Sequence, residues 1–118
     1  MERKTKFTKK PWGNFRQFTL NEVSTVKILT VEPHQCLSKQ SHRNRDEMWV
    51  ALDEGAEVEL DDKRFKPEKG QEILIPRGTV HRLFAYDTTC RMLEISFGIF
   101  DEDDIIRYED AYGRLESE

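Results

Sequence analysis

The feature that most limits the fold of this chain is a succession of short, strand-like segments between residues 25 and 98. Within 25–33 the side chains alternate, with Val26, Ile28 and Thr30 in one set and Lys27, Leu29 and Val31 in the other. Similar short apolar or alternating segments are 47–52, 57–60, 64–67, 71–76, 81–86 and 91–98. Gly, Pro and Asp residues separate these segments. Many short strands at roughly regular spacing predict an all-β fold, either an antiparallel sandwich or a barrel.

The two ends of the chain do not follow this pattern. Residues 101–113, DEDDIIRYEDAYG, start with acidic residues and stop at a glycine, which predicts one short helix over the C-terminal segment 101–114. Residues 1–10 carry five basic residues and are expected to be a mobile, solvated arm. A length of 118 residues suits one core, so residues 1–118 are expected to form a single domain.

The composition argues against several classes of protein. A net charge of −4 speaks against nonspecific binding to nucleic acid as the main activity. No apolar run approaches the roughly 20 residues of a membrane span, and the N-terminus lacks the apolar core of a signal peptide. We therefore expect no membrane contact and a cytoplasmic location. Cys36 and Cys90 form no CxxC pair and are expected to be reduced thiols.

The segment QSHRNRDEMW, which begins at Gln40, crowds a histidine and several charged groups at the start of a strand. If residues 38–52 form two strands joined by a tight turn, Gln40 and His42 share one face and Glu47 returns within reach of them. His81 follows a Pro-x-Gly turn at the start of its own strand. Together these four residues offer oxygen and nitrogen ligands suited to a divalent transition metal ion.

These residues also carry a resemblance to a known family. Two sequence motifs characterise the cupins, which are jelly-roll barrels also called double-stranded β-helices. The second motif is nearly complete here in Gly70, Pro76, Gly78 and His81. The first motif is present as Gln40-x-His42-x4-Glu47, with Gln in place of the first histidine. With Gln at this position, the motif resembles that of the cupin domain of type II phosphomannose isomerases.

The resemblance extends over nearly the whole chain in four blocks that follow the family's order. The matching residues are Pro11 to Phe15, then Leu37, Ser38, Gln40, His42, Arg45, Glu47 and Trp49, then Ile75, Pro76, Gly78 and His81 to Leu83, and finally Asp103, Asp104, Ile105, Arg107, Asp110 and Tyr112 to Arg114. The resemblance implies a cupin barrel and a homodimer. It also implies an isomerase domain standing alone, without the nucleotidyltransferase domain that precedes it in the bifunctional enzymes.

The activity that the resemblance implies is a metal-dependent interconversion of mannose 6-phosphate and fructose 6-phosphate. One divalent transition metal ion would be bound by Gln40, His42, Glu47 and His81. Zinc is the first expectation, and manganese, cobalt, nickel and iron are the alternatives. The expected partner is therefore a small sugar phosphate.

An aldose–ketose isomerase also needs a base and cations for the phosphate. The residues expected to be catalytic are Arg45, Glu94 and Arg107, and those expected to bind substrate are Arg107, Tyr112 and Arg114. Glu94 is the candidate base; it shares a face of its strand with Met92 and Ser96, and the sequence leaves open whether that face looks into the barrel. Arg82 alternates with His81 and is predicted to point away from the site.

The sequence departs from the family pattern at a few positions. They are His34 in place of a glycine, Gly55 displaced by one residue, Asn44 and Met48 in place of histidines, and Ala85 in place of an asparagine. The loss of ionisable groups at Asn44 and Met48 favours one alternative, a cupin that binds a sugar phosphate without turning it over. The other alternative is a metal-binding cupin of another class, an oxygenase or a different sugar isomerase, because one scaffold hosts many chemistries.

Overall fold

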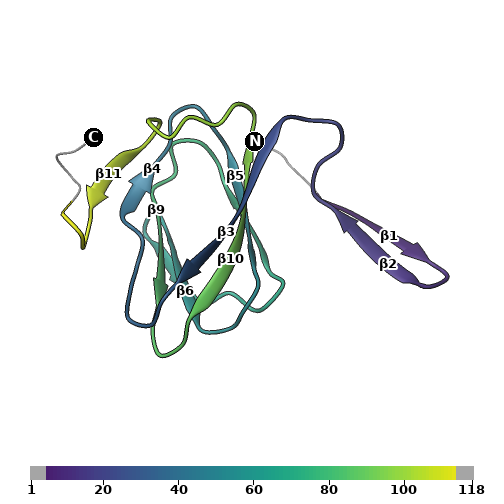
Figure 1. Cartoon of the computed structure of the whole chain (residues 1–118), viewed down its shortest axis with the longest axis horizontal. Coiled ribbons are helices and arrows are strands. Elements are labelled where there is room, and N and C mark those ends of the chain that lie inside the picture. The colour runs from purple at the N-terminus through teal and green to yellow at the C-terminus, as the bar shows by residue number, and fades with distance from the viewer. Residues whose placement is uncertain (1–4, 114–118) are drawn as a thin grey trace.

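The computed structural model describes residues 5–113, and these residues form β-strands and connecting loops without a helix (Figure 1). The strands are β1 (Lys6–Lys10), β2 (Gly13–Gln17), β3 (Ser24–Val31), β4 (Lys39–Ser41), β5 (Glu47–Ala51), β6 (Ala56–Leu60), β7 (Lys63–Phe65), β8 (Glu72–Ile75), β9 (His81–Ala85), β10 (Cys90–Phe97) and β11 (Ile106–Glu109). The expected all-β class is confirmed, and the predicted strand segments between residues 25 and 98 all contain a strand.

Two antiparallel sheets face each other and enclose the core. One sheet has the order β3-β10-β5-β8, and the other has the order β11-β4-β9-β6-β7. A separate two-stranded hairpin, β1-β2, projects from the side of this barrel (Figure 1). Apart from the hairpin β6-β7, neighbouring strands in the two sheets come from distant parts of the sequence, so residues that are far apart in the chain line the same interior.

The interior is filled by the side chains that alternate inward from both sheets. Trp49 and Ala51 of β5, Val58 of β6, Leu83 of β9 and Met92 of β10 are each exposed by 1% or less and belong to one apolar cluster. Burying this surface is the main force that holds the two sheets together. It also fixes the register, because a slip by one residue would turn each inward side chain outward.

The outer face of the four-stranded sheet is apolar as well. Met48 and Val50 of β5 and Ile95 and Phe97 of β10 form a second buried cluster, against which Phe18 packs. Strands β5 and β10 therefore bury both of their faces, which explains why β5 reads as a continuous apolar run rather than as an alternating one.

The position of His34 shows how one motif residue is accommodated. The first cupin motif has a glycine where this chain has His34, and the backbone there has a φ of 64°. This left-handed conformation costs a glycine nothing and a residue with a Cβ some energy. The His34 N–H donates a hydrogen bond of 2.9 Å to the carbonyl of Tyr86, which holds the turn in place.

The predicted C-terminal helix over 101–114 is wrong for the residues that the structure describes. Asp101 begins a turn in which its carbonyl accepts from the Asp104 N–H at 3.1 Å and its carboxylate accepts from the Asp103 N–H at 3.0 Å. The chain then enters β11, which pairs with β4. Aspartates stabilise such turns as readily as they cap helices, and the edge of β4 offers backbone partners that an isolated helix would lack.

Two other local predictions also need correction. The expected mobile arm over residues 1–10 includes a regular strand, since residues 6–10 are β1 and pair with β2; residues 1–4 lie outside the described part of the chain. The predicted strand pair within 38–52 is wrong, because β4 and β5 lie in opposite sheets. The loop between β4 and β5 instead crosses one end of the barrel, and His42 lies in this crossing.

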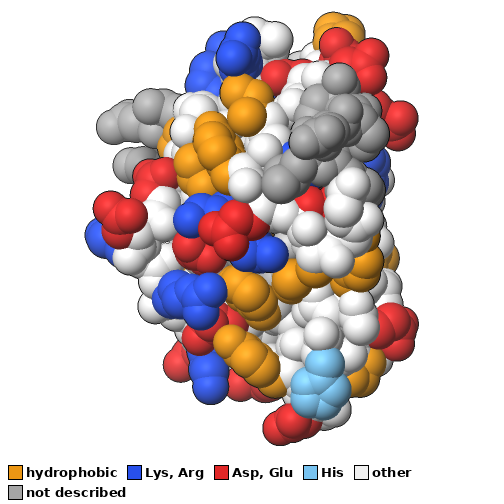
Figure 2. Space-filling view, turned by 90° about the vertical axis from the view of Figure 1, so that its left-hand side faces the viewer, with side chains coloured by type: hydrophobic (Ala, Val, Ile, Leu, Met, Phe, Trp, Pro, Cys, Tyr) orange, Lys and Arg blue, Asp and Glu red, His pale blue; other side chains and the backbone are white. Residues whose placement is uncertain are grey.

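The surface carries charges of both signs. In the view of Figure 2, basic and acidic side chains lie beside one another, with apolar side chains between them. Over the described residues, no helix is long and apolar enough to span a bilayer.

Candidate metal centre and substrate cavity

Three separate segments bring a histidine pair and a glutamate to one end of the barrel. His42 follows β4, while Glu47 and His81 are the first residues of β5 and β9. The turn before His81 is closed by a 3.0 Å hydrogen bond from Thr79 N–H to the Pro76 carbonyl, and its third residue, Gly78, has a φ of 83°. A type II turn requires this conformation at that position, which glycine adopts without strain.

The two loops that carry the histidines are also bonded to each other. The Gly78 N–H donates a 2.7 Å hydrogen bond to the carbonyl of His42. The ring centroids of His42 and His81 lie 5.0 Å apart, and Trp49 packs edge-on against His81 at 5.4 Å. The positions of both imidazoles are therefore fixed by backbone contacts and by the core below them.

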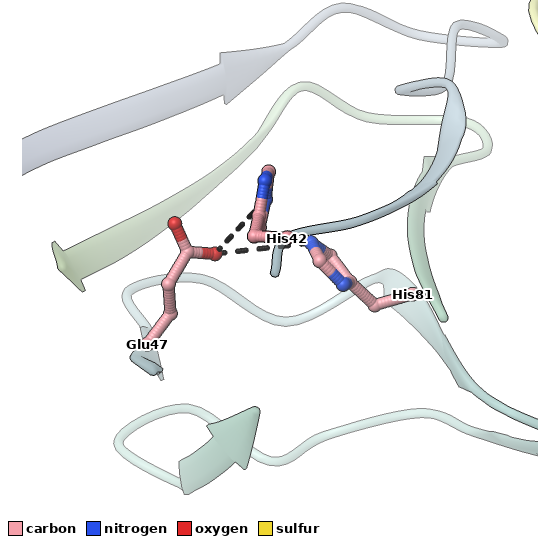
Figure 3. A group of neighbouring side chains, drawn as sticks. All are labelled: His42, Glu47 and His81. Atoms are coloured by element: carbon pink, nitrogen blue, oxygen red, sulfur yellow. Dashed lines mark ion pairs between the residues drawn. The ribbon is translucent and has the colours of Figure 1, made fainter. Parts of the chain in front are cut away.

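His42, Glu47 and His81 converge on one point (Figure 3). The Oε1 atom of Glu47 lies 3.6 Å from Nε2 of His42 and 3.8 Å from Nε2 of His81. The three candidate ligand atoms lie within 4.8 Å of one another, and all three residues are buried. A divalent ion with bonds of about 2.0–2.2 Å to nitrogen and oxygen fits a cluster of this size.

Hydrogen bonds at the far side of each ring orient both histidines. Nδ1 of His42 lies 2.7 Å from the carbonyl of Asp104, and Nδ1 of His81 lies 2.9 Å from the carbonyl of Thr79. A carbonyl can only accept, so each Nδ1 carries the proton and each Nε2 keeps its lone pair. Metal-binding histidines are commonly held in this way by a backbone carbonyl or a carboxylate.

Burial keeps both imidazoles neutral. It lowers the pKa of His81 to about 4, against opposing effects of the Thr79 carbonyl and Glu47. Burial also lowers the pKa of His42 below its ordinary value, although Glu47 works in the opposite direction. Neutral imidazole is the form that binds a metal.

The donor atoms themselves fit a metal ion. Among the described residues, Oε1 of Glu47 and Nε2 of His81 have no hydrogen-bond partner, although both atoms are buried. Leaving such atoms without a partner is costly, and an ion between them would remove that cost. The third atom, Nε2 of His42, lies 3.3 Å from Nη2 of Arg45, a long contact that a metal would replace.

Arg45, expected to be catalytic, is buried beside this cluster and supports it. Its Nε donates a 2.8 Å hydrogen bond to Oε2 of Glu47, and its Nη1 donates to the carbonyl of Asp101 at 3.0 Å. Ser96 Oγ donates to the same Glu47 oxygen at 3.0 Å. Oε2 is thereby occupied, which directs Oε1 toward the two histidines.

A cavity of about 620 Å³ lies against the cluster. Its walls are formed by Lys27, Leu29, Leu37, Gln40, His42, Arg45, Glu94, Phe100, Glu102, Asp103, Ile105 and Arg107. This volume is within the range of small-molecule sites, and the lining carries both cationic and anionic groups. Four of these residues come from the segment 99–105, which we call the strap.

Glu94, the candidate base, lines this cavity. Its face of β10, shared with Met92 and Ser96, looks into the barrel, which settles the orientation that the sequence leaves open. Burial, together with the charge of Glu47, raises the pKa of Glu94 to about 7, while a 3.2 Å hydrogen bond from Trp49 Nε1 works in the opposite direction. A carboxyl with a pKa near 7 can exchange protons at neutral pH.

The remaining predicted residues are placed differently from one another. Gln40 lies opposite His81 on β9 and opposite Arg107 on β11, and both Gln40 and Arg107 line the cavity. Tyr112 does not line it; its hydroxyl donates to Gln35 Oε1, and it borders a separate depression. Arg114 lies outside the described residues.

Arg82 points away from the cluster, as predicted. Its Nε donates a 3.0 Å hydrogen bond to the carbonyl of Leu37, and Nη1 forms an ion pair with Glu109 at 3.6 Å. It is not among the residues that line the cavity.

The departures at Asn44 and Met48 do not touch the cavity. Met48 alternates with Glu47 and packs in the cluster on the outer face of the sheet. Asn44 is exposed in the loop after β4 and lines no part of the cavity. The cavity and the candidate metal ligands are thus complete without the two histidines that the family pattern has at these positions.

Several residues of the site were not found from the sequence. Lys27 lines the cavity with its ammonium 4.0 Å from the ring centroid of Phe100, and the guanidinium of Arg45 lies 4.6 Å from the same ring. The alternation along β3 could have indicated Lys27, because it is the single charged residue on the strand face that also carries Leu29 and Val31. No local pattern marks Phe100 or Asp104, because their loop reaches the site from 60 residues away.

Comparisons with known proteins identify the family of this chain. The family model for the mannose-6-phosphate isomerase C-terminal domain matches residues 2–110. Alginate biosynthesis protein AlgA of Pseudomonas fluorescens is 36% identical over 107 residues, which are 89% of this chain and 22% of AlgA. Mannose-1-phosphate guanylyltransferase ManC of Salmonella typhimurium is 33% identical over 108 residues, 90% of this chain and 22% of ManC.

A solved structure supports the fold independently. The structure of a cupin 2 conserved barrel domain protein from Salinispora arenicola superimposes with a TM-score of 0.60 at 22% identity, over 68% of this chain and 67% of that one. The fold is therefore a cupin barrel. The chain spans about a fifth of the length of the curated relatives that it matches. Since the family model covers most of the sequence, the chain belongs to the mannose-6-phosphate isomerase C-terminal family.

Proposed function

We propose that this chain catalyses the metal-dependent interconversion of mannose 6-phosphate and fructose 6-phosphate. The observation that carries the proposal is the buried cluster of His42, Glu47 and His81, which adjoins a cavity that also contains the titratable Glu94. Two of the cluster's three donor atoms have no hydrogen-bond partner among the described residues. Family membership supports the choice of substrate, since the family model is named for this isomerase.

The metal would be held by His42, Glu47 and His81. Gln40 of β4, which lies opposite His81 of β9, would be the fourth ligand. When bound, a divalent ion supplies Lewis-acid polarisation of the substrate's carbonyl oxygen. Zinc is the first metal to test, followed by manganese, cobalt, nickel and iron, because mixed imidazole and carboxylate sites accept all of these. Arg45 contributes by holding Oε2 of Glu47, so that the other oxygen is available to the metal.

Glu94 is the proposed base. In the direction from aldose to ketose, its carboxylate removes the proton from C2 and a proton is returned to C1, while the proton of the C2 hydroxyl moves to the C1 oxygen. A carboxyl whose pKa is about 7 is ionised in a large share of molecules at neutral pH and is basic enough to take up that proton. The Trp49 N–H fixes one of its oxygens, which limits the rotation of the carboxylate.

Arg107 is the proposed contact for the phosphate, because it lines the cavity from β11 and a guanidinium can bind phosphate with two parallel hydrogen bonds. Lys27 lines the same cavity and adds a second positive charge. Arg114, which the sequence also assigned to substrate binding, stays a prediction, as do the homodimer and the cytoplasmic location.

The test is a coupled assay with mannose 6-phosphate on protein that has been freed of metal with a chelator and then reloaded with each metal in turn. We expect no turnover in the metal-free protein and recovery with at least one divalent ion. Metal-loaded protein that binds the sugar phosphate without converting it would favour the non-catalytic alternative. Oxygen uptake with bound iron would favour a cupin oxygenase.

A further inference from the structure

We infer that Asp104 is a positioning residue of the metal centre, and that through Asp104 the strap couples closure of the cavity to metal binding. This inference rests on the metal site of the proposed function. It concerns a residue that the sequence analysis matches to the family pattern without giving it a role, and that belongs neither to the proposed ligand set nor to the cavity lining.

Asp104 contacts the loop after β4 at three points. Its carbonyl accepts the proton of His42 Nδ1 at 2.7 Å. Its two carboxylate oxygens accept from the backbone N–H groups of Arg43 at 2.8 Å and of Asn44 at 3.0 Å. One residue thus fixes both the ring of a metal ligand and the backbone of the loop that carries this ligand.

The Asp104 carboxylate bonds two adjacent backbone N–H groups of the loop after β4 at once. Charge-assisted hydrogen bonds of this kind are about twice as strong as neutral ones. The strap therefore holds the loop after β4 at two adjacent residues, Arg43 and Asn44, through one carboxylate.

The strap is itself held in a defined shape, so Asp104 acts from a fixed position. The Asp101 turn described above closes it on one side, and the Ile105 N–H donates a 2.9 Å hydrogen bond to the Asp103 carbonyl. Arg45 adds a second link, since its Nη1 donates to the Asp101 carbonyl and its guanidinium stacks on Phe100. Both links join the strap to residues of the candidate metal centre.

This arrangement makes the strap and the metal site depend on each other. Phe100, Glu102, Asp103 and Ile105 of the strap form one wall of the cavity. A ligated imidazole is a stronger donor from Nδ1, so metal binding should strengthen its bond to the Asp104 carbonyl and hold the strap in place. By linkage, a strap that is held closed should in turn tighten metal binding.

The experiment measures the affinity for Co²⁺ of the full chain by competition with a chromophoric chelator, in wild type, Asp104→Ala, Asp104→Asn and Asp103→Asn. Outer contacts of this kind typically change metal affinity by about 10- to 100-fold. We expect a loss of this size in Asp104→Ala and a smaller loss in Asp104→Asn, whose amide oxygen can still accept one bond. Asp103→Asn removes a neighbouring charge without touching the loop after β4, so its affinity for Co²⁺ should stay close to that of wild type.

Two further readouts separate positioning from a general structural role. The visible absorption spectrum of bound Co²⁺ reports the ligand geometry and should change in Asp104→Ala. Hydrogen exchange of residues 100–105 should slow on Co²⁺ addition in wild type and much less in Asp104→Ala. The melting temperature of the metal-free variants shows whether they fold, and Asp104→Asn carries the test if Asp104→Ala does not.

Unchanged affinity and spectrum in both Asp104 variants would overturn the inference, and so would an equal loss in Asp103→Asn, which would point to charge alone. A wild-type protein that binds no Co²⁺ would overturn the inference together with the metal site. A wild type that binds Co²⁺ but isomerises no sugar phosphate would remove the proposed reaction and leave the role of Asp104 intact.

Discussion

Strand β10 passes through two regions of the barrel that differ in chemistry along a single face. At one end, Cys90 and Met92 are each 1% exposed and pack in the apolar core. Two residues further along the same face, Glu94 and Ser96 are also buried but bond to Trp49 and Glu47. The same period-two alternation therefore supplies the core at one end and the candidate site at the other.

The comparison shows how this fold can bury a charged cluster. Buried polar groups are tolerated when they are paired, and most of those around Glu47 are paired with one another. The exceptions, Glu47 Oε1 and His81 Nε2, are the atoms assigned to the metal. The apolar end supplies stability that offsets the cost of the polar end, so changes at the two ends should have separable effects.

The largest separation is expected from removing two ligands together. The double variant His42→Ala, His81→Ala should lose both metal binding and isomerase activity, the latter to the level of the reaction without protein. Its metal-free form should stay folded, because neither imidazole belongs to the apolar cluster. Elemental analysis and the coupled assay provide the measurement, and retained metal at one ion per chain would contradict the ligand assignment.

A smaller effect on catalysis is expected from Glu94→Gln. The amide cannot accept the proton from C2, and losing a general base typically costs about 10²- to 10⁴-fold in rate. Metal content should be unchanged, since Glu94 is not a proposed ligand. Steady-state kinetics on the metal-loaded variant would check this, and a rate within a few-fold of wild type would mean that another group serves as the base.

For Arg107→Ala we expect a loss in kcat/KM with the phosphorylated sugar of about 2–5 kcal/mol in transition-state stabilisation, as for other charge-assisted contacts. The loss should be much smaller with the unphosphorylated sugar, if that sugar reacts measurably. Equal losses with both sugars would show that Arg107 acts elsewhere in the site than at the phosphate.

The opposite pattern is expected from Met92→Ala in the apolar end. Truncating a buried methionine typically costs about 2–5 kcal/mol of unfolding free energy. Activity per folded molecule should stay close to that of wild type, because Met92 belongs to the apolar cluster and is not itself one of the residues that line the cavity. Chemical denaturation and active-site titration measure the two quantities, and a large drop in activity of the folded protein would show that the ends are not separable.

The smallest effect concerns pH and stability. The pKa of Glu94 is raised to about 7 from an ordinary 4.5, so the fold favours the protonated carboxyl. That contribution is complete below the pKa of the unfolded chain and is lost as the pH rises through about 7. The metal-free wild type should therefore lose stability as the pH rises from 5 to 8, whereas Glu94→Gln lacks this loss. The stability of the variant relative to wild type should accordingly be greater at pH 8 than at pH 5. Melting curves of both proteins at pH 5 and at pH 8 measure this change. A stability difference between variant and wild type that is the same at both pH values would contradict the raised pKa of Glu94.

The sequence predicted the parts of this structure that are set by local patterns. Alternation and turn residues located the strands of the barrel, and two motif segments supplied Gln40, His42, Glu47 and His81. The pairing of the strands was harder to predict from the sequence. Residues 38–52 were expected to form a hairpin, yet β4 and β5 lie in opposite sheets. Which strands pair is decided by packing across the whole barrel, and no local signal records it.

The C-terminal segment shows the same limit. DEDDIIRYEDAYG has the acidic start and glycine stop of a helix, but tertiary contacts turn it into the strap and β11. Asp104 therefore could not be assigned a role from its sequence neighbours, because its partners Arg43 and Asn44 are 61 and 60 residues away. The orientation of Glu94 depended in the same way on which side of β10 faces the interior.

The most direct test of the polar end as a metal centre is anomalous X-ray scattering from crystals of the protein loaded with Zn²⁺ or Mn²⁺. The predicted result is one strong peak per chain between Glu47 Oε1 and Nε2 of His42 and of His81, at bond lengths of about 2.0–2.2 Å. A protein that gives no peak there, or gives one only at exposed surface carboxylates, would contradict the account.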